Sequence, residues 1–132
     1  MRVFGLILAS LMMSACATGM NENPLYKYAD IQIANLTGAT ISNVKIEVGP
    51  GGYTLACASV LNNELCQKQF NEIPYPDQPI QLSWVGSNGS QMSKQLSPEI
   101  LPQFPPGIIL QIVINIRSDG SVDAELQPDG WS

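Results

Sequence analysis

The feature that most constrains the fold is a series of short segments in which apolar and polar residues alternate, separated by turn-forming residues. In one of them, Val44, Ile46 and Val48 alternate with charged or amide side chains. A period of two places apolar side chains on one face of a β-strand and polar side chains on the other. Eight segments of this character are predicted as strands, at residues 29–36, 41–48, 53–59, 66–73, 79–85, 91–96, 108–117 and 122–127.

The spacing of these segments indicates the fold class. Strands that recur at intervals of roughly 8–12 residues are typical of sandwiches and barrels. The chain has 132 residues, which fits one domain, and 45% of them are apolar, which is typical of a globular protein. We therefore predict an all-β fold, an antiparallel Ig-like β-sandwich of about 7–8 strands with one intrachain disulfide.

Two hairpins can be aligned from the residue pattern alone. A three-residue loop at 87–89 pairs Trp84 with Met92. A three-residue loop at 118–120 likewise pairs Ile116 with Val122. A two-residue loop would oppose a core position to a polar one, because a slip of one residue moves every side chain to the other face. Both loops end in glycine, which readily adopts the left-handed conformation needed there. The longest apolar row lies in 108–117, so this strand is expected at the centre of its sheet.

Two cysteines predict a disulfide. Cys57 and Cys66 flank eight residues, with Asn62 and Asn63 near the midpoint as a turn. Opposed positions of a hairpin bring Cβ atoms to about 4.5–5.5 Å, which a disulfide can bridge with modest adjustment. The alternatives are a redox pair, which more often shows C-x-x-C spacing, and a zinc site, which would need two further ligands from a chain without His.

The first residues have the character of an export signal. Arg2 is followed by an apolar run at 3–13 and then by small residues. This is the order of a secretory signal, and the run is shorter than the about 20 residues of a transmembrane helix.

The sequence Met13-Ser14-Ala15-Cys16 resembles the lipobox of bacterial lipoproteins. The resemblance implies cleavage before Cys16 and attachment of a diacylglyceryl group and palmitate to that residue, which also accounts for the odd cysteine. Ala17 rather than Asp follows Cys16, which in this family implies the outer membrane. A second interpretation stays open, because Ala15-Cys16-Ala17 also fits a cleavage site that would release an unlipidated protein.

The predicted organisation follows from these features. Residues 1–15 form the signal peptide, 16–28 the lipidated cysteine with a flexible tether, and 29–132 the β-sandwich domain. Twelve flexible residues have a root-mean-square reach of about 20 Å, so the domain is expected to stay close to its membrane.

Side chains suited to catalysis are scarce. Without His the chain has no Ser-His-Asp triad and no His-ligated metal. A net charge of −5 with six scattered cations argues against nucleic-acid binding. The carboxylates of Asp119, Asp123, Glu125 and Asp129 are interpreted as a solvated strand face. We expect no catalytic residue, no metal, no cofactor and no small-molecule substrate.

Two proline-rich connections, at 73–79 and 97–107, carry the large side chains Tyr75 and Phe104. Proline stiffens the chain, so one interpretation is a rigid docking surface for a partner protein that includes these two residues. The other is a pair of crossovers whose apolar residues cap the core.

The segment 35–41, Asn-Leu-Thr-Gly-Ala-Thr-Ile, is similar to the opening of some small exported β-domains of unassigned function. Locally, Gly38 permits a turn, and Asn35 and Thr37 can bond to nearby backbone.

Together these features predict a non-enzymatic lipoprotein, anchored in the outer membrane, that binds a protein partner as an accessory module of an envelope assembly. The alternative is an acidic periplasmic inhibitor of a cationic enzyme such as lysozyme, because a negative chain is suited to a positive target.

Overall fold

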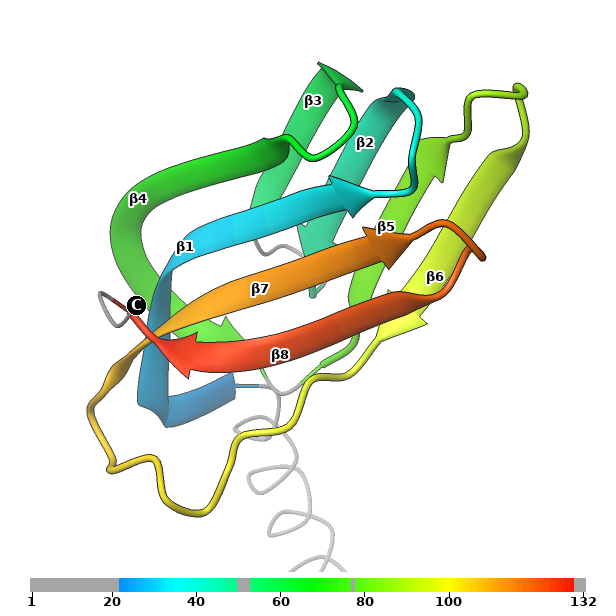
Figure 1. The fold of residues 1–132 in the computed structure, drawn as a ribbon. Helices are drawn as coiled ribbons and strands as arrows, with labels where there is room; N and C mark the ends of the chain where they lie inside the picture. The colour runs from blue at the N-terminus through cyan, green and yellow to red at the C-terminus, as the bar shows by residue number, and fades with distance from the viewer. Residues whose placement is uncertain (1–21, 50–52, 77, 130–132) are drawn as a thin grey trace, which may run out of the picture.

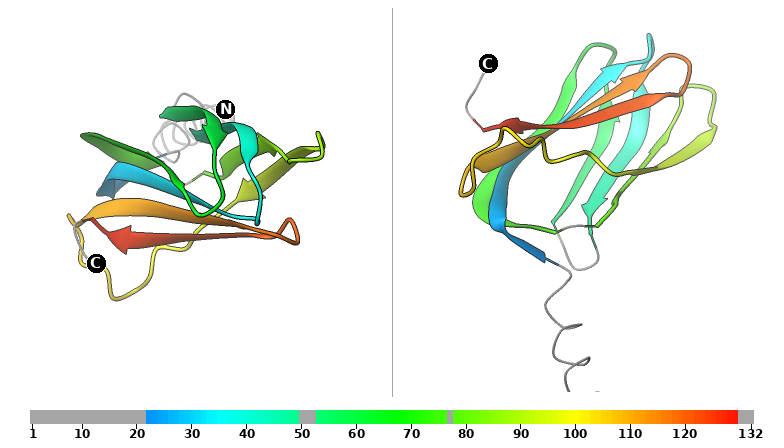
Figure 2. Two further views of the ribbon diagram at one scale, coloured as in Figure 1. Left: turned by 45° about the horizontal axis from the view of Figure 1, so that its top comes forward. Right: turned by 90° about the horizontal axis from the view of Figure 1, so that it is seen from below.

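The computed structural model describes residues 22–49, 53–76 and 78–129, and the regular structure in them is entirely β (Figure 1). The eight strands are β1 (Glu22–Leu36), β2 (Ile41–Val48), β3 (Thr54–Val60), β4 (Leu65–Pro76), β5 (Ile80–Val85), β6 (Gln91–Leu96), β7 (Ile109–Arg117) and β8 (Val122–Pro128). Sheet A has the order β4-β1-β7-β8, and sheet B has the order β3-β2-β5-β6. The two sheets form separate layers (Figure 2), which confirms the predicted β-sandwich. The described residues contain no helix that could span a membrane.

The predicted strand bounds are close for most strands, with differences in β1 and β4. Strands β2 and β6 match their predictions residue for residue. Strand β4 continues through Pro74 to Pro76. It does so because it is an edge strand, in which a missing N–H can face away from the sheet.

The predicted tether was wrong over residues 22–28, which belong to strand β1. Within this stretch Lys27 and Tyr28 pair with β4 on one side and with β7 on the other. Tyr26 and Tyr28 are buried. These two tyrosines alternate with Lys27, and the pattern was too short to be recognised as the start of a strand.

One pair of strands, β1 and β7, is parallel, where an antiparallel sandwich was expected. The reason is topological. Successive strands alternate in direction, so all odd-numbered strands run the same way, and β1 and β7 are neighbours in sheet A. The other neighbouring pairs are antiparallel.

The core lies between the sheets and is filled by the apolar rows that the sequence showed. In β7, Leu110, Ile112, Ile114 and Ile116 have no exposed surface, and β7 is an inner strand as predicted. The fully buried large side chains are Tyr28, Ile31, Ile33, Val44, Ile46, Val48, Ile80, Leu82, Leu110, Ile112, Ile114 and Ile116. Burying a side chain of this size contributes about 1.5–3 kcal/mol, so these rows dominate the stability of the fold.

Both predicted hairpin registers are confirmed. Trp84 pairs with Met92 in the β5–β6 hairpin, and Ile116 pairs with Val122 in the β7–β8 hairpin. Trp84 is buried, as expected of a core residue. Gly89 and Gly120, the last residues of the two loops, both have a φ of +86°. This left-handed conformation is strained for residues with a side chain, which explains the glycines.

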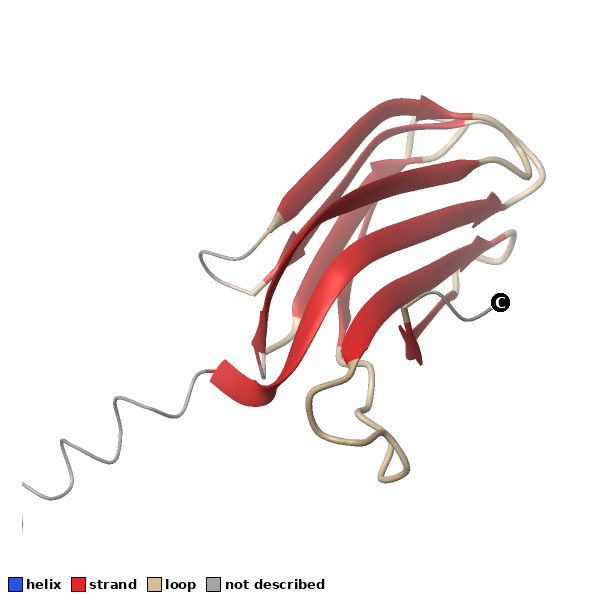
Figure 3. Cartoon of the chain, turned by 90° about the vertical axis from the view of Figure 1, so that its left-hand side faces the viewer, coloured by secondary structure: helices blue, strands red, loops and turns tan. Residues whose placement is uncertain are grey.

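The alternation of strand direction divides the turns between two ends of the sandwich (Figure 3). The β1–β2, β3–β4, β5–β6 and β7–β8 connections lie at one end, which we call the turn end. Strand β1 begins at the opposite end, beside the β6–β7 connection, and we call this the entry end.

An aromatic cluster fills the core toward the entry end of β1. The ring of Tyr28 meets the rings of Phe70 and Tyr75 edge to face, with centroids 5.3 and 5.9 Å away. Tyr53 stacks on Phe70 at 4.0 Å. Burial raises the pKa of Tyr28 from 10.0 to about 12, because the interior disfavours the charged phenolate.

The raised pKa of Tyr28 predicts a loss of stability in alkaline solution. The neutral phenol is favoured in the folded state, so its contribution is complete below about pH 10 and is lost as the pH rises through about 12. At ~1.4 kcal/mol per pKa unit, the free energy of unfolding should fall by up to about 3 kcal/mol over this range. Urea unfolding of the protein and of Tyr28→Phe across this pH range measures the fall in the free energy of unfolding. The variant is the control, since it lacks the titrating group. Equal pH dependence of the two proteins would contradict this account.

Candidate functional site

The disulfide joins the two sheets close to the turn end. Cys57 lies in β3 of sheet B and Cys66 in β4 of sheet A, with 6.2 Å between their Cα atoms. The predicted pairing is confirmed, but the predicted hairpin is wrong, because β3 and β4 belong to different sheets. Asn63 forms the turn between them with a φ of +67°. The bond therefore fastens an edge strand of sheet B to an edge strand of sheet A.

Asn35 is the centre of a hydrogen-bond network at the turn end. Its side chain is fully buried. Nδ2 donates to the carbonyl oxygens of Ala39 and Val60 at 2.8 and 2.9 Å. Oδ1 accepts from the Thr37 backbone N–H at 3.0 Å and from the Thr37 hydroxyl at 2.7 Å. The expected local bonds of Asn35 and Thr37 are confirmed, and the bond to Val60 also ties the β1–β2 turn to strand β3.

Further hydrogen bonds fasten the β1–β2 and β3–β4 turns to each other. The backbone N–H of Asn63 donates to the Asn35 carbonyl at 2.7 Å, and the N–H of Asn35 donates to the Glu64 carbonyl at 3.0 Å. The N–H of Gly38 donates to Oδ1 of Asn62 at 2.8 Å. The carboxylate of Glu64 accepts from the Leu61 N–H at 3.2 Å. Together with the disulfide, these bonds hold the two turns as one rigid unit.

This rigid unit carries three exposed leucines. The exposed fractions are 39% for Leu36, 53% for Leu61 and 49% for Leu65, and these are the exposed large apolar side chains of the described residues. Leu36 ends β1, and Leu65 begins the neighbouring strand β4 opposite Ala34. Leu61 and Leu65 flank the β3–β4 turn. We call Leu36, Leu61 and Leu65 the leucine tip.

A cleft opens on the other side of the β1–β2 turn. It has a volume of about 320 Å³ and lies among the β1–β2, β5–β6 and β7–β8 turns. Ile41, Trp84 and Met92 contribute apolar surface. Polar or charged side chains come from Thr37, Ser87, Asn88, Ser90, Arg117, Ser118 and Asp119. A volume near 300 Å³ with mixed polar and apolar lining is at the lower end of the range for ligand sites.

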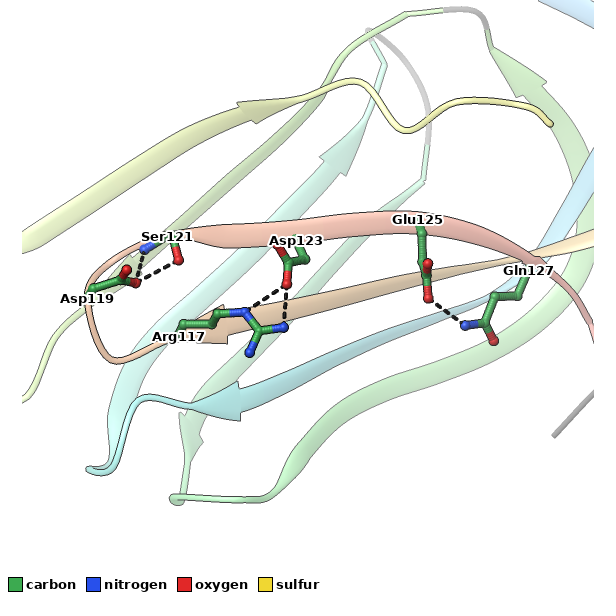
Figure 4. A network of polar contacts seen from close by, with 6 residues as sticks. All are labelled: Arg117, Asp119, Ser121, Asp123, Glu125 and Gln127. Carbon is green, nitrogen blue, oxygen red and sulfur yellow. Dashed lines mark hydrogen bonds and ion pairs between the residues drawn. The ribbon is translucent and has the colours of Figure 1, made fainter.

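The acidic residues of the β7–β8 hairpin each have a local partner (Figure 4). Arg117 forms an ion pair with Asp123, with Nε 2.7 Å from Oδ2. Asp119 accepts hydrogen bonds from the hydroxyl and the backbone N–H of Ser121 at 2.6 and 2.9 Å, and these bonds lower its pKa. Glu125 accepts from Gln127 at 2.7 Å. The carboxylates are exposed and point to separate partners, which matches their interpretation as a solvated face rather than an acid–base pair.

The outer face of sheet A holds a buried carboxylate. Asp30 is 2% exposed. It accepts hydrogen bonds from Nε2 of Gln111 at 2.8 Å and from Nε2 of Gln67 at 3.2 Å. These glutamines come from β7 and β4, the two neighbours of β1. The arrangement satisfies the buried carboxylate with amide donors from both neighbouring strands.

The two predicted docking residues are wrong, because both are buried. Tyr75 is 3% exposed and lies in β4 against Tyr28. Phe104 is 8% exposed, and its carbonyl accepts a hydrogen bond from the Tyr26 hydroxyl at 2.9 Å. Both side chains belong to the hydrophobic core, as the second interpretation stated. Cys16 lies outside the described residues.

Sequence reasoning missed the leucine tip. Leu61 and Leu65 stand on either side of the turn formed by Asn62 and Asn63, so neither belongs to the buried apolar row of a strand. Leu36 follows Asn35, and the alternation in β1 puts it on the face opposite to Ile33. Apolar residues next to turn residues were the available signal.

Among residues 22–49, 53–76 and 78–129, no three Cys, Asp or Glu side chains come together in a way that could hold a metal ion. The sequence matches no protein-family model and no curated protein. The structure is similar to that of a protein from Eubacterium rectale determined by NMR, with a TM-score of 0.47 and 9% identity. The similarity covers 79% of this chain and 90% of the other.

Removal of the disulfide should destabilise the protein without removing the fold. A bond that closes a loop of about ten residues stabilises by about 2.7 kcal/mol in the chain-entropy model, and losses of about 2–5 kcal/mol are typical. We expect Cys57→Ala with Cys66→Ala to lower the free energy of unfolding by this amount in urea. The reduced wild-type protein is the control and should lose a similar amount. An unchanged unfolding midpoint would refute the cross-linking role.

Proposed function

We propose that the protein is an exported lipoprotein, anchored through Cys16 in the outer membrane, and that it is a non-enzymatic module that binds a protein of the cell envelope. One observation carries this proposal. The exposed leucines and the cleft lie at the turn end, and strand β1 begins at the entry end. An anchor attached before β1 would therefore present the turn end away from the membrane.

The position of β1 makes the proposed tether short. Strand β1 begins at Glu22, so residues 17–21 separate Cys16 from the sheet. The step from Cys16 to Glu22 spans at most about 22 Å when fully extended. The domain would stand directly on its membrane and act on partners close to it.

The turn end has the properties of a binding surface. Binding residues are commonly held on loops by a rigid scaffold. Here Asn35 and the disulfide supply the rigidity, and the leucines and the cleft supply apolar surface beside polar groups. The disulfide also supports export, since such bonds persist in oxidising compartments.

The test of the anchor is the intact mass of the mature protein from a membrane fraction, measured before and after reduction. We expect a chain that begins at acylated Cys16 and that gains two hydrogens on reduction of Cys57–Cys66. Cys16→Ser is the control and should leave the membrane fraction. An unacylated chain that begins at Thr18 would contradict the lipid anchor.

A second candidate function is inhibition of a cationic enzyme such as lysozyme. The observation that favours it is the net charge of −5, with exposed Asp119, Asp123 and Glu125 along one hairpin. Opposite charges steer association, and salt screens them beyond about 10 Å at 0.1 M.

An inhibitor of this kind has a measurable signature. If the protein were such an inhibitor, it would block lysis by lysozyme, and its association rate would fall steeply between low and physiological salt. Asp123→Asn with Glu125→Gln should slow association, and Gln69→Ser on the same sheet should not. Because we favour the binding module, we expect no inhibition at any salt concentration. Salt-dependent inhibition would favour the inhibitor of a cationic enzyme over the binding module.

A further inference from the structure

We infer that the leucine tip is a docking surface for an apolar recess on a partner protein, and that a Lys or Arg of this partner faces Glu64. The inference rests on the proposed function, because it takes the chain to be anchored ahead of β1. It goes further in naming the surface and the chemistry of the partner.

The first argument is the concentration of exposed apolar surface. The large exposed apolar side chains of the described residues are all members of the tip. Elsewhere on the outer face of sheet A, β1 and β7 carry the polar side chains of Gln32, Gln111 and Asn115, which are half-buried. Exposed apolar side chains gain about 25 cal/mol for each Å² that a partner covers. A cluster at one end therefore marks a place where contact is favourable.

The second argument is rigidity. The tip is built on two turns joined by the Asn35 bonds, by the bond from Gly38 to Asn62 and by the nearby disulfide. A surface that is already ordered loses less conformational entropy when it binds. The leucines are thus held in a fixed arrangement suited to a complementary recess.

The anchoring membrane does not fit as the occupant. Strand β7 has nine residues and a length of about 30 Å, and β1 runs beside it to Leu36. An inverted domain would need its entry end about 30 Å above the membrane, beyond the about 22 Å span of the tether. Lying flat on sheet A would press the exposed amide of Gln67 and the half-buried amides of Gln32 and Gln111 against lipid, at a cost in lost hydration.

A second copy of the chain also fits poorly. Glu64 is exposed between Leu61 and Leu65, and one of its oxygens is fixed by the Leu61 N–H. A symmetric pair of tips would bring two such carboxylates together, which is unfavourable. The same fixed carboxylate suits a cation at the rim of a partner's recess, since charge complementarity selects partners and orients them.

Site-specific photo-crosslinking in intact cells tests the surface. The probe is benzoylphenylalanine placed at Leu61 of the full chain, and the matched control places it at Gln95, an exposed position of β6. We expect one protein adduct from Leu61, at a yield at least tenfold above that from Gln95. Equal yields, no adduct, an adduct with lipid alone or an adduct with a second copy would each overturn the inference.

Binding of the purified adduct partner then tests the chemistry. Leu61→Ser and Leu65→Ser should each weaken the Kd at least tenfold, and Gln95→Ser should leave it unchanged. Glu64→Lys should weaken the Kd at least tenfold at low salt and less at high salt. All these side chains are exposed, and unchanged unfolding midpoints in urea will show that the variants fold. An unaltered Kd for Leu61→Ser, or for Glu64→Lys at low salt, would overturn the docking surface.

The intact mass of the protein from the same membranes shows whether Cys16 is acylated. It thereby separates failure of the lipid anchor from failure of the docking surface. If Cys16 is acylated and Leu61 gives no adduct, the docking surface fails and the anchor stands. If Cys16 is unacylated and Leu61 still gives its adduct, the anchor fails, and the argument against a membrane occupant must then be replaced by a direct measurement. Absence of binding to phosphatidylethanolamine–phosphatidylglycerol vesicles is the result expected of that measurement.

Discussion

The pairing of β1 with β7 forms the centre of sheet A, and the arrangement of the other strands of this sheet depends on it. Strand β1 supplies Ile31 and Ile33 and β7 supplies Ile112 and Ile114, and these four side chains are buried side by side at the centre of sheet A. The pair joins residues 81 positions apart, such as Asp30 and Gln111. Every other strand of sheet A is placed by one of these two, since β4 pairs with β1 and β8 pairs with β7. The direction of the pair also decides which turns share one end.

At the turn end, a buried hydrogen-bond network around Asn35 lies next to exposed apolar side chains. A buried carboxamide such as that of Asn35 stabilises only when its hydrogen bonds are all made, because an unpaired buried polar group costs about 1–3 kcal/mol. Here four hydrogen bonds satisfy the Asn35 carboxamide. They fix the β1–β2 turn and tie it to the end of β3, where the β3–β4 turn begins. The apolar side chains on those turns stay in water. Local order without local burial is common where a surface serves binding rather than stability.

Much of the fold could be predicted from the sequence, because the period of two determines which side chains face the core. Most strand bounds and both hairpin registers followed from it, and the cysteine pairing followed from the spacing of Cys57 and Cys66 around a turn. The neighbours in each sheet did not, because alternation does not specify which strands pair across 81 residues. The residues of the candidate site were harder to predict from the sequence. The rings of Tyr75 and Phe104 were equally consistent with a surface or a core position, and only the packing around Tyr28 and Tyr26 places them inside. Leu61 and Leu65 carry no periodic signal.

The parallel pair in sheet A also delays the completion of folding during synthesis. During synthesis, β1 leaves the ribosome long before its partner β7, with 81 residues between paired positions. At about 5–20 residues per second, the wait is about 4–16 s. Sheet B and β4 can form in this interval, but the inner edge of β1 stays open until nearly the whole chain has emerged. A chain of this topology therefore remains incompletely folded through most of its synthesis.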